Sequence, residues 1–69
     1  MEIIKIKDDF IKLGQALKLG GLVDSGVEAK IVIQEGKVLL NNKPELQRGK
    51  KVVPGDVISY QNQSIKVEN

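Results

Sequence analysis

The sequence holds 69 residues, of which 41% are hydrophobic and 29% are charged, and its formal net charge is +2. This length suits one domain over residues 1–69 with a small core. Cysteine and histidine are both absent, which excludes disulfides, thiolate zinc sites and the commonest catalytic base, so we expect no metal and no cofactor. No run is apolar enough for a signal peptide or a membrane span, and we expect a cytoplasmic protein without a membrane partner.

The first third of the chain predicts a strand followed by a helix. Residues 2–6 form a short β-prone run. Apolar residues then recur at helical spacing, namely Phe10, Leu13, Ala16 and Leu17. We therefore place a first helix near residues 10–19, with Phe10 in the core. Asp8-Asp9 suits its start, where negative charge is favourable, and Gly20-Gly21 suits its end.

A second helix is predicted after a tight turn. Ser25-Gly26-Val27-Glu28 matches a capping box, in which the serine oxygen and the glutamate carboxylate each accept an N–H at the helix start. Ala29, Val32 and Ile33 mark its buried face, and Gly36 is its predicted end. The β-branched run 31–33 has low helix propensity, so a strand here stays open as the alternative.

A hairpin with a basic loop is predicted next. Residues 37–40 are strand-like, and Asn41-Asn42 is a good two-residue turn because asparagine tolerates a positive φ. Pro44 cannot donate a ladder hydrogen bond, so the returning strand should be short or at an edge. Residues 46–51 then form a basic loop.

The last segment predicts a corner and a second hairpin. Pro54-Gly55 fits the central positions of a type II turn. Residues 56–60 and 64–67 are expected to pair, with the turn at Asn62-Gln63. The predicted order is therefore one strand, two helices and four strands, without a linker or an internal repeat.

Positive charge is concentrated in the middle third of the chain. Residues 30–51 hold six basic residues against two acids, a net charge of +4, whereas the segments 1–29 and 52–69 each have a net charge of −1. This asymmetry is expected of an anion-binding face. A solvated lysine-rich loop is the alternative, and charge alone does not separate the two.

Two basic groups carry the binding hypothesis. Lys30, Gln34 and Lys37 are spaced so that they share one side of the second helix and its exit. Arg48, Lys50 and Lys51 form the second group, which suits phosphate contact. The chain has only two aromatic residues, so base stacking should not dominate, and structured RNA recognised by backbone and shape fits better.

Catalysis has no visible apparatus in this sequence, and we expect no enzyme and no small-molecule substrate. Ser25 is better explained as a helix cap, and Asp8-Asp9 as a charged helix start. The segment 44–50 has proline where a phosphate-binding loop needs its first glycine, and no helix is predicted after it.

The motifs together resemble the S-four RNA-binding domain, or alpha-L motif. Residues 13–30 look like its two-helix core, 35–42 look like its "G-x-V-x-V-N-G" hairpin, and 48–51 with 54–56 look like its closing segment. The likeness is strongest to small stand-alone bacterial proteins of the YaaA and YbcJ type. It implies an α+β fold, with two short helices packed on a small, mainly antiparallel sheet of four to five strands.

The resemblance also implies a function and a set of site residues. It implies binding of structured RNA, ribosomal or transfer RNA, in ribosome assembly or translation. By position the role falls on Lys18, Lys30, Lys37, Asn41, Asn42, Arg48, Lys50 and Lys51. Two departures are Asn42, where glycine is usual, and a second helix whose only basic residue is Lys30. Because the charge is thin, we expect tight binding to need a ribosomal particle or a partner protein. An adaptor that contacts protein on such a particle through Ile31 is the alternative function.

Overall fold

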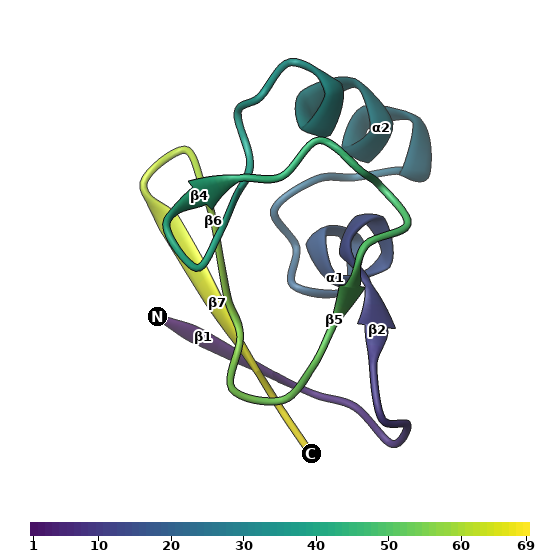
Figure 1. Cartoon of the computed structure of the whole chain (residues 1–69), viewed down its shortest axis with the longest axis vertical. Coiled ribbons are helices and arrows are strands. Elements are labelled where there is room, and N and C mark those ends of the chain that lie inside the picture. Colours follow the sequence, from purple (N-terminus) through teal and green to yellow (C-terminus); the bar gives the residue numbers. More distant parts are fainter.

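Two helices pack beside a five-stranded sheet, and a two-stranded sheet extends from the first helix (Figure 1). A computed structural model describes all residues from Met1 to Asn69. Its elements are β1 (Glu2–Lys5), β2 (Ile11–Lys12), α1 (Leu13–Leu19), α2 (Gly26–Gln34), β3 (Leu39–Leu40), β4 (Lys43–Pro44), β5 (Lys51–Val52), β6 (Val57–Tyr60) and β7 (Gln63–Glu68). The larger sheet has the order β1-β7-β6-β3-β4, and the smaller one pairs β2 with β5. Only β1 and β7 are parallel, so the expected α+β fold with a mainly antiparallel sheet is confirmed.

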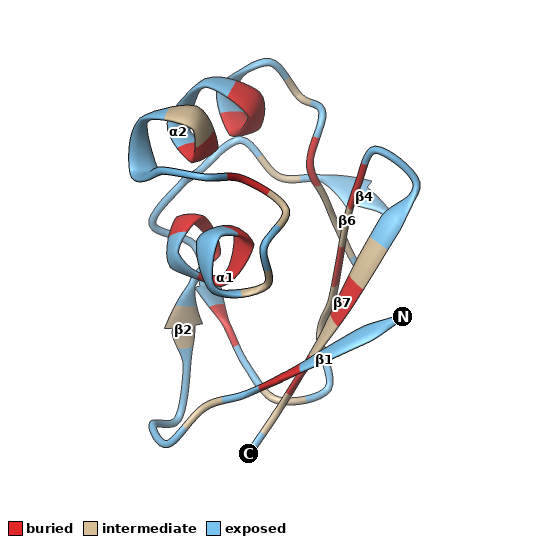
Figure 2. Ribbon diagram, turned by 180° about the vertical axis from the view of Figure 1, so that it is seen from behind, coloured by how far each residue is buried: buried red, intermediate tan, exposed pale blue.

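The core lies between the helices and the sheet. Alternate residues of the central strands, such as Ile58 and Ile65, are fully buried and lie opposite one another in the β6–β7 register. Leu13 and Leu17 from α1 and Ile33 from α2 are also fully buried. Figure 2 shows the buried positions on the inner faces of both helices and along β6 and β7. This one cluster fixes the helices on the sheet.

The first helix begins later than predicted, at Leu13, because Ile11 and Lys12 pair with β5 instead. The prediction that Asp8 or Asp9 caps this helix is wrong. The N-cap residue is Lys12, which makes no side-chain cap bond. A tertiary contact replaces the cap, since backbone carbonyls of the 48–50 loop accept hydrogen bonds from the first two N–H groups of the helix.

The prediction that Phe10 lies in the core is also wrong, because Phe10 is 37% exposed. It lies before the helix, so the helical periodicity that placed it in the core does not extend to it. Its ring instead lies under the ammonium group of Lys51, whose Nζ is 4.8 Å from the ring centroid. This geometry is that of a cation–π contact.

The second helix forms as predicted, and the strand alternative for residues 31–33 is wrong. Ser25 Oγ accepts a hydrogen bond from the N–H of Glu28 at 3.1 Å. The Glu28 carboxylate accepts from Asp24 N–H at 2.9 Å, one residue before the expected donor. The helix ends at Gln34, and Gly36, just past its C-cap Glu35, has a φ of +75° that suits glycine. Burial of Ile33 against the core outweighs low helix propensity.

Both predicted hairpin turns exist, but one is displaced. Asn41 and Asn42 have φ values of 53° and 70°, as a hairpin turn with two positive φ values requires, and they lead into the short edge strand β4. The turn of the β6–β7 hairpin lies at 61–62 and not at 62–63. Pairing of Tyr60 with Gln63 keeps the buried residues of both strands on one face, which fixes that register. The predicted turn at Pro54-Gly55 is confirmed by a φ of 99° at Gly55.

Candidate nucleic-acid interface

A hollow beside α1 is lined by cationic side chains and glycines. It has a volume of about 370 Å³, and we call it the basic hollow. Its lining residues are Lys12, Gly14, Gln15, Lys18, Gly26, Arg48 and Gly49. Three of these side chains are cationic, none is acidic and none is apolar. The hollow can therefore receive a hydrated anionic group, and no hydrophobic residue lines it.

Backbone contacts position this hollow. Leu13 N–H donates to the Lys50 carbonyl at 2.9 Å, and Gly14 N–H donates to the Arg48 carbonyl at 3.1 Å. These bonds hold the 48–50 loop against the start of α1. Gly14 has no side chain to interfere, and a Cβ placed on it would lie only 2.6 Å from Arg48 Cγ. The stem of Arg48 thus lies directly on the first turn of the helix, which brings its guanidinium to the hollow.

Lys12 is a site residue that our sequence reasoning missed. It lines the basic hollow and is also the cross-strand partner of Lys51 in the β2–β5 pair. Directly opposed residues of an antiparallel pair project from the same face, so these two lysines lie side by side. Pairing between residues nearly forty positions apart has no local sequence signal. Alternation of Ile11 with Lys12 would have been the only hint.

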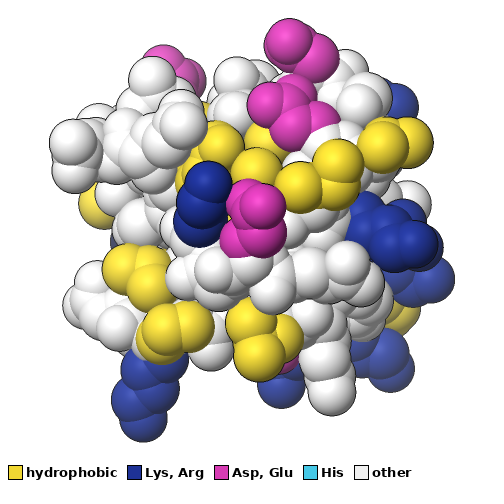
Figure 3. Space-filling model, turned by 90° about the horizontal axis from the view of Figure 1, so that it is seen from above, with side chains coloured by type: hydrophobic (Ala, Val, Ile, Leu, Met, Phe, Trp, Pro, Cys, Tyr) yellow, Lys and Arg dark blue, Asp and Glu magenta, His cyan; other side chains and the backbone are white.

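Lys30 and Lys50 lie next to the basic hollow. Lys30 is exposed one turn beyond Gly26, on the same side of α2. Lys50 is exposed and belongs to the loop that bonds to α1. We call the basic hollow with these two residues and Lys51 the basic face. In the view onto α2, Lys and Arg side chains gather at the right, on the side where Figure 1 shows β2 and β5 (Figure 3).

The other predicted site residues lie elsewhere. Lys37 follows α2, forms the one ion pair of the molecule with Glu35 at 3.1 Å and lines a different hollow with Tyr60. Asn41 is occupied within the fold. Its Nδ2 donates to Asp56 Oδ1 at 3.0 Å, and its Oδ1 accepts from Val57 N–H at 2.9 Å. Asn42 is exposed in the same turn.

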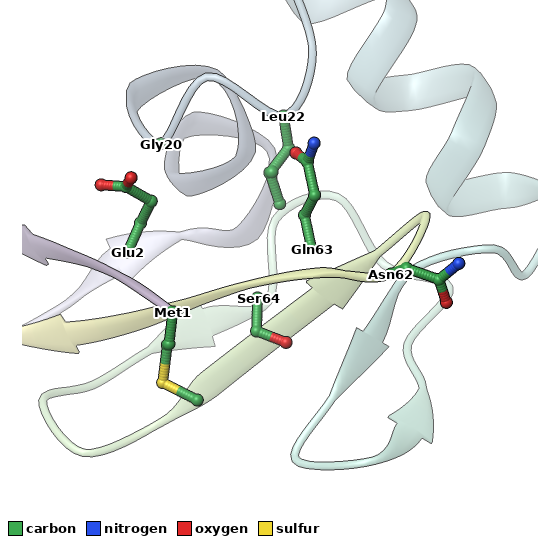
Figure 4. Close-up of a pocket in the computed structure, with 7 residues that line it drawn as sticks. All are labelled: Met1, Glu2, Gly20, Leu22, Asn62, Gln63 and Ser64. Atoms are coloured by element: carbon green, nitrogen blue, oxygen red, sulfur yellow. The ribbon is translucent and has the colours of Figure 1, made fainter.

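The largest hollow of the molecule has a different character. It measures about 540 Å³ and is lined by residues from the start of β1, the turn after α1 and the β6–β7 hairpin (Figure 4). Its only charged side chain is Glu2, and no lysine or arginine lines it. Size alone would select this hollow, but an anionic ligand would meet a carboxylate there. Charge therefore singles out the smaller basic hollow as the candidate site.

Three further properties bear on function. No three His, Cys, Asp or Glu side chains come together in a group that could hold a metal ion. None of the helices has the length and apolar character needed to cross a membrane. Carboxylates also stay out of bonding distance of the cations in the basic hollow, since the only ion pair lies at Lys37.

Comparison with known proteins gives consistent matches over nearly the whole chain. Residues 4–68 match the model of the S4 domain family. The "Probable ribosome maturation protein RlbA" of Bacillus subtilis (strain 168) is 41% identical over 58 residues, which cover 84% of this chain and 82% of that protein. The "Putative RNA-binding protein YbcJ" of Escherichia coli (strain K12) is 36% identical over 61 residues, covering 88% and 87%.

A solved structure has the same fold. The solution structure of Escherichia coli YbcJ, described as revealing an alpha-L motif involved in RNA binding, superimposes with a TM-score of 0.76 at 33% sequence identity. The superposition covers 100% of this chain and 89% of that one. The alpha-L arrangement of two helices on a small sheet is therefore shared by the two proteins.

Proposed function

The chain belongs to the S4 domain family, and from this membership we propose that it binds structured RNA through the basic face, in ribosome assembly or translation. The observation that carries the proposal is the basic hollow, where Lys12, Lys18 and Arg48 converge without a neighbouring carboxylate. Several cations on one surface are what a phosphate backbone requires. The S4 family is a family of RNA-binding domains and not of enzymes, and the proposal contains no catalytic step.

Recognition by backbone and shape is supported by the positions of the two aromatic residues. Tyr60 is buried, and Phe10 lies under the ammonium group of Lys51. Tyr60 therefore offers no ring for stacking an unpaired base, and Lys51 covers one face of the Phe10 ring. Phosphate and ribose contacts to a folded RNA are therefore favoured over reading of single-stranded bases.

The choice of a ribosomal partner rests on the relatives. The Bacillus subtilis relative is named as a ribosome maturation protein, and the Escherichia coli relative as an RNA-binding protein. Ribosomal RNA, free or within a ribosomal particle, is accordingly the proposed target, with transfer RNA as the second candidate. The thin charge of α2, which has Lys30 as its one basic residue, favours a particle that supplies further contacts.

Replacement of Arg48, Lys50 and Lys51 by alanine tests the proposal. The triple variant should weaken binding to ribosomal RNA and lower the slope of log affinity against log salt by about 2 to 3, because each lost phosphate contact removes a little less than one unit. Fluorescence anisotropy at several salt concentrations measures both quantities, and circular dichroism verifies the fold.

A matched control separates a local contact from net charge. Replacement of Lys37, Lys43 and Lys66 by alanine removes the same charge away from the basic hollow. This control should keep most of the affinity and most of the salt slope. Equal losses in the two triple variants would mean that no particular face binds RNA and would remove the proposal.

A second candidate function has one specific observation in its favour. Val27 and Ile31 are one turn apart on α2 and are 70% and 49% exposed. Such a pair is an apolar stripe suited to protein contact. An adaptor acting on a ribonucleoprotein particle would use it. A partner that stays bound after nuclease treatment, and is lost on Ile31→Asn, would favour this function.

A further inference from the structure

The structure points to a more specific role for the basic hollow: we propose that it is a receptor for one tetrahedral phosphate group of the bound RNA, held by Lys12, Lys18 and Arg48. This inference rests on the proposed function and deepens it, because it separates one discrete phosphate site from the general attraction of a basic surface. Lys12 was not among the RNA-binding residues predicted from the sequence, and the proposal makes it one of the three residues that hold the phosphate.

The charge of the hollow is the first argument. Three cationic side chains border a volume of about 370 Å³, and carboxylates are absent from its lining. Other hollows differ, since Glu2 lines one, Asp8 lines another, and Lys37 is the only charged residue of the last. Like charges gathered around one space repel one another, and a bound anion relieves that repulsion. The unliganded protein is therefore arranged to gain from binding an anion at this place.

Preorganisation of Arg48 is the second argument. Its stem rests on Gly14, where a Cβ would lie 2.6 Å from Cγ and 3.2 Å from Cδ. Its carbonyl is fixed by the N–H of Gly14. Packing of the stem limits the rotamers of a long side chain, so less conformational entropy is lost when the guanidinium binds. A guanidinium forms two parallel hydrogen bonds to a phosphate.

The remaining lining fits a phosphate and not a base. The amide of Gln15 can donate hydrogen bonds, and the backbone N–H groups of Gly26 and Gly49 have no acceptor within the chain. All of these are donors to oxygen. No aromatic side chain lines the hollow, so a nucleobase would find no aromatic ring on which to stack. The charged part of a nucleotide is thus the part that the hollow accepts.

Inorganic phosphate is the direct probe. The full chain is titrated with phosphate, and its amide signals are monitored by NMR while chloride keeps the ionic strength constant. We expect saturable shifts centred on Gly14, Gly26 and Gly49. Arg48→Gln and Lys18→Gln should each weaken phosphate binding at least about tenfold, as loss of a charge-assisted hydrogen bond implies. Lys43→Gln, on the edge strand of the larger sheet, should change it less than about twofold, since salt screens distant charges.

A second variant tests the geometry without changing charge. Gly14→Ala forces the Arg48 stem away from α1, so phosphate binding should weaken severalfold while the net charge of the protein stays constant. If this variant does not fold, the glutamine variants still decide the matter. Shifts spread evenly over all lysine-bearing surfaces, or an equal loss in Lys43→Gln, would overturn the inference.

RNA itself identifies the source of the phosphate. A 5′-phosphorylated RNA hairpin and its 5′-hydroxyl form should bind equally if the hollow takes a backbone phosphodiester. The phosphorylated form should bind more tightly if it takes a terminal phosphate. In either case, inorganic phosphate must compete with the RNA for binding to the protein. RNA binding that is retained while phosphate gives no saturable shifts refutes the receptor but not the proposed function. Saturable phosphate binding without RNA binding refutes the proposed function.

Discussion

Replacement of Asn41 by glycine tests whether this residue serves the fold or the RNA. The side chain connects the β3–β4 turn to the corner before β6 through two hydrogen bonds, to Asp56 Oδ1 at 3.0 Å and from Val57 N–H at 2.9 Å. Glycine keeps the positive φ of 53° without strain but removes both bonds. At about 0.5–1.5 kcal/mol for each bond, the expected loss in free energy of unfolding is about 2 kcal/mol.

Asn42→Gly is the matched control, because Asn42 has a φ of 70° and is exposed in the same turn. Both variants add the same backbone freedom to the unfolded chain, so the difference between them isolates the hydrogen bonds. For a domain of this size, whose total stability is of the order of 3–10 kcal/mol, that difference is large. It corresponds to a fall of roughly 8–16 °C in Tm.

Urea unfolding followed by circular dichroism measures the difference, and the m-value should be unchanged. RNA affinity under conditions where both variants are folded should stay near that of the parent. Equal unfolding midpoints for the two variants would refute a structural role for the side chain. A large loss of RNA affinity in Asn41→Gly with unchanged stability would restore Asn41 as an RNA contact.

Two further predictions concern stability. Ser25→Ala should lower the free energy of unfolding by about 1 kcal/mol, because it removes the oxygen that accepts from Glu28 N–H, whereas Ser25→Asp should keep most of that stability. Urea midpoints that do not differ between the alanine and aspartate variants would contradict this. Leu17→Ala should lower the free energy of unfolding by about 3 kcal/mol, because Leu17 is fully buried in the core cluster formed by both helices and the sheet. Calorimetry should show the corresponding fall in Tm. A cost below 1 kcal/mol would show that its surroundings collapse into the space.

Local patterns predicted the parts of the fold that local chemistry determines. The capping serine at Ser25, the glycine that ends α2 and the positive-φ asparagine turn all follow from the preferences of single residues, and the structure has each of them. The β2–β5 pair was not predictable in this way. It joins two segments of only two residues each, and its formation displaces the start of α1 from 10 to 13. Non-local pairing therefore outweighed helical periodicity at that point.

The candidate site shows the same division. Sequence reasoning placed Lys18 and Arg48 in the binding set, and both line the basic hollow. It could not find Lys12, whose position depends on the unpredicted strand pair. It also could not separate Lys37 from the basic residues that have no acidic partner. Lys37 pairs with Glu35, and the path of the backbone after the end of α2 decides whether these two nearby charges meet. Whether the grouped residues bind RNA stays a prediction for the alanine and phosphate experiments.

The backbone attachment of the basic loop (residues 46–51) to α1 explains how a domain with a small core can carry the basic face. The loop is held by backbone carbonyls of Arg48 and Lys50, which satisfy N–H groups at the start of α1. Its side chains are therefore not needed for its conformation and stay exposed for a ligand. Side-chain truncation at these two positions should leave the helix start intact. A change at Gly14, by contrast, moves backbone and guanidinium together. Gly14 thus serves both the fold and the site. Side-chain substitutions at Arg48 or Lys50 should change the site without changing the start of the helix.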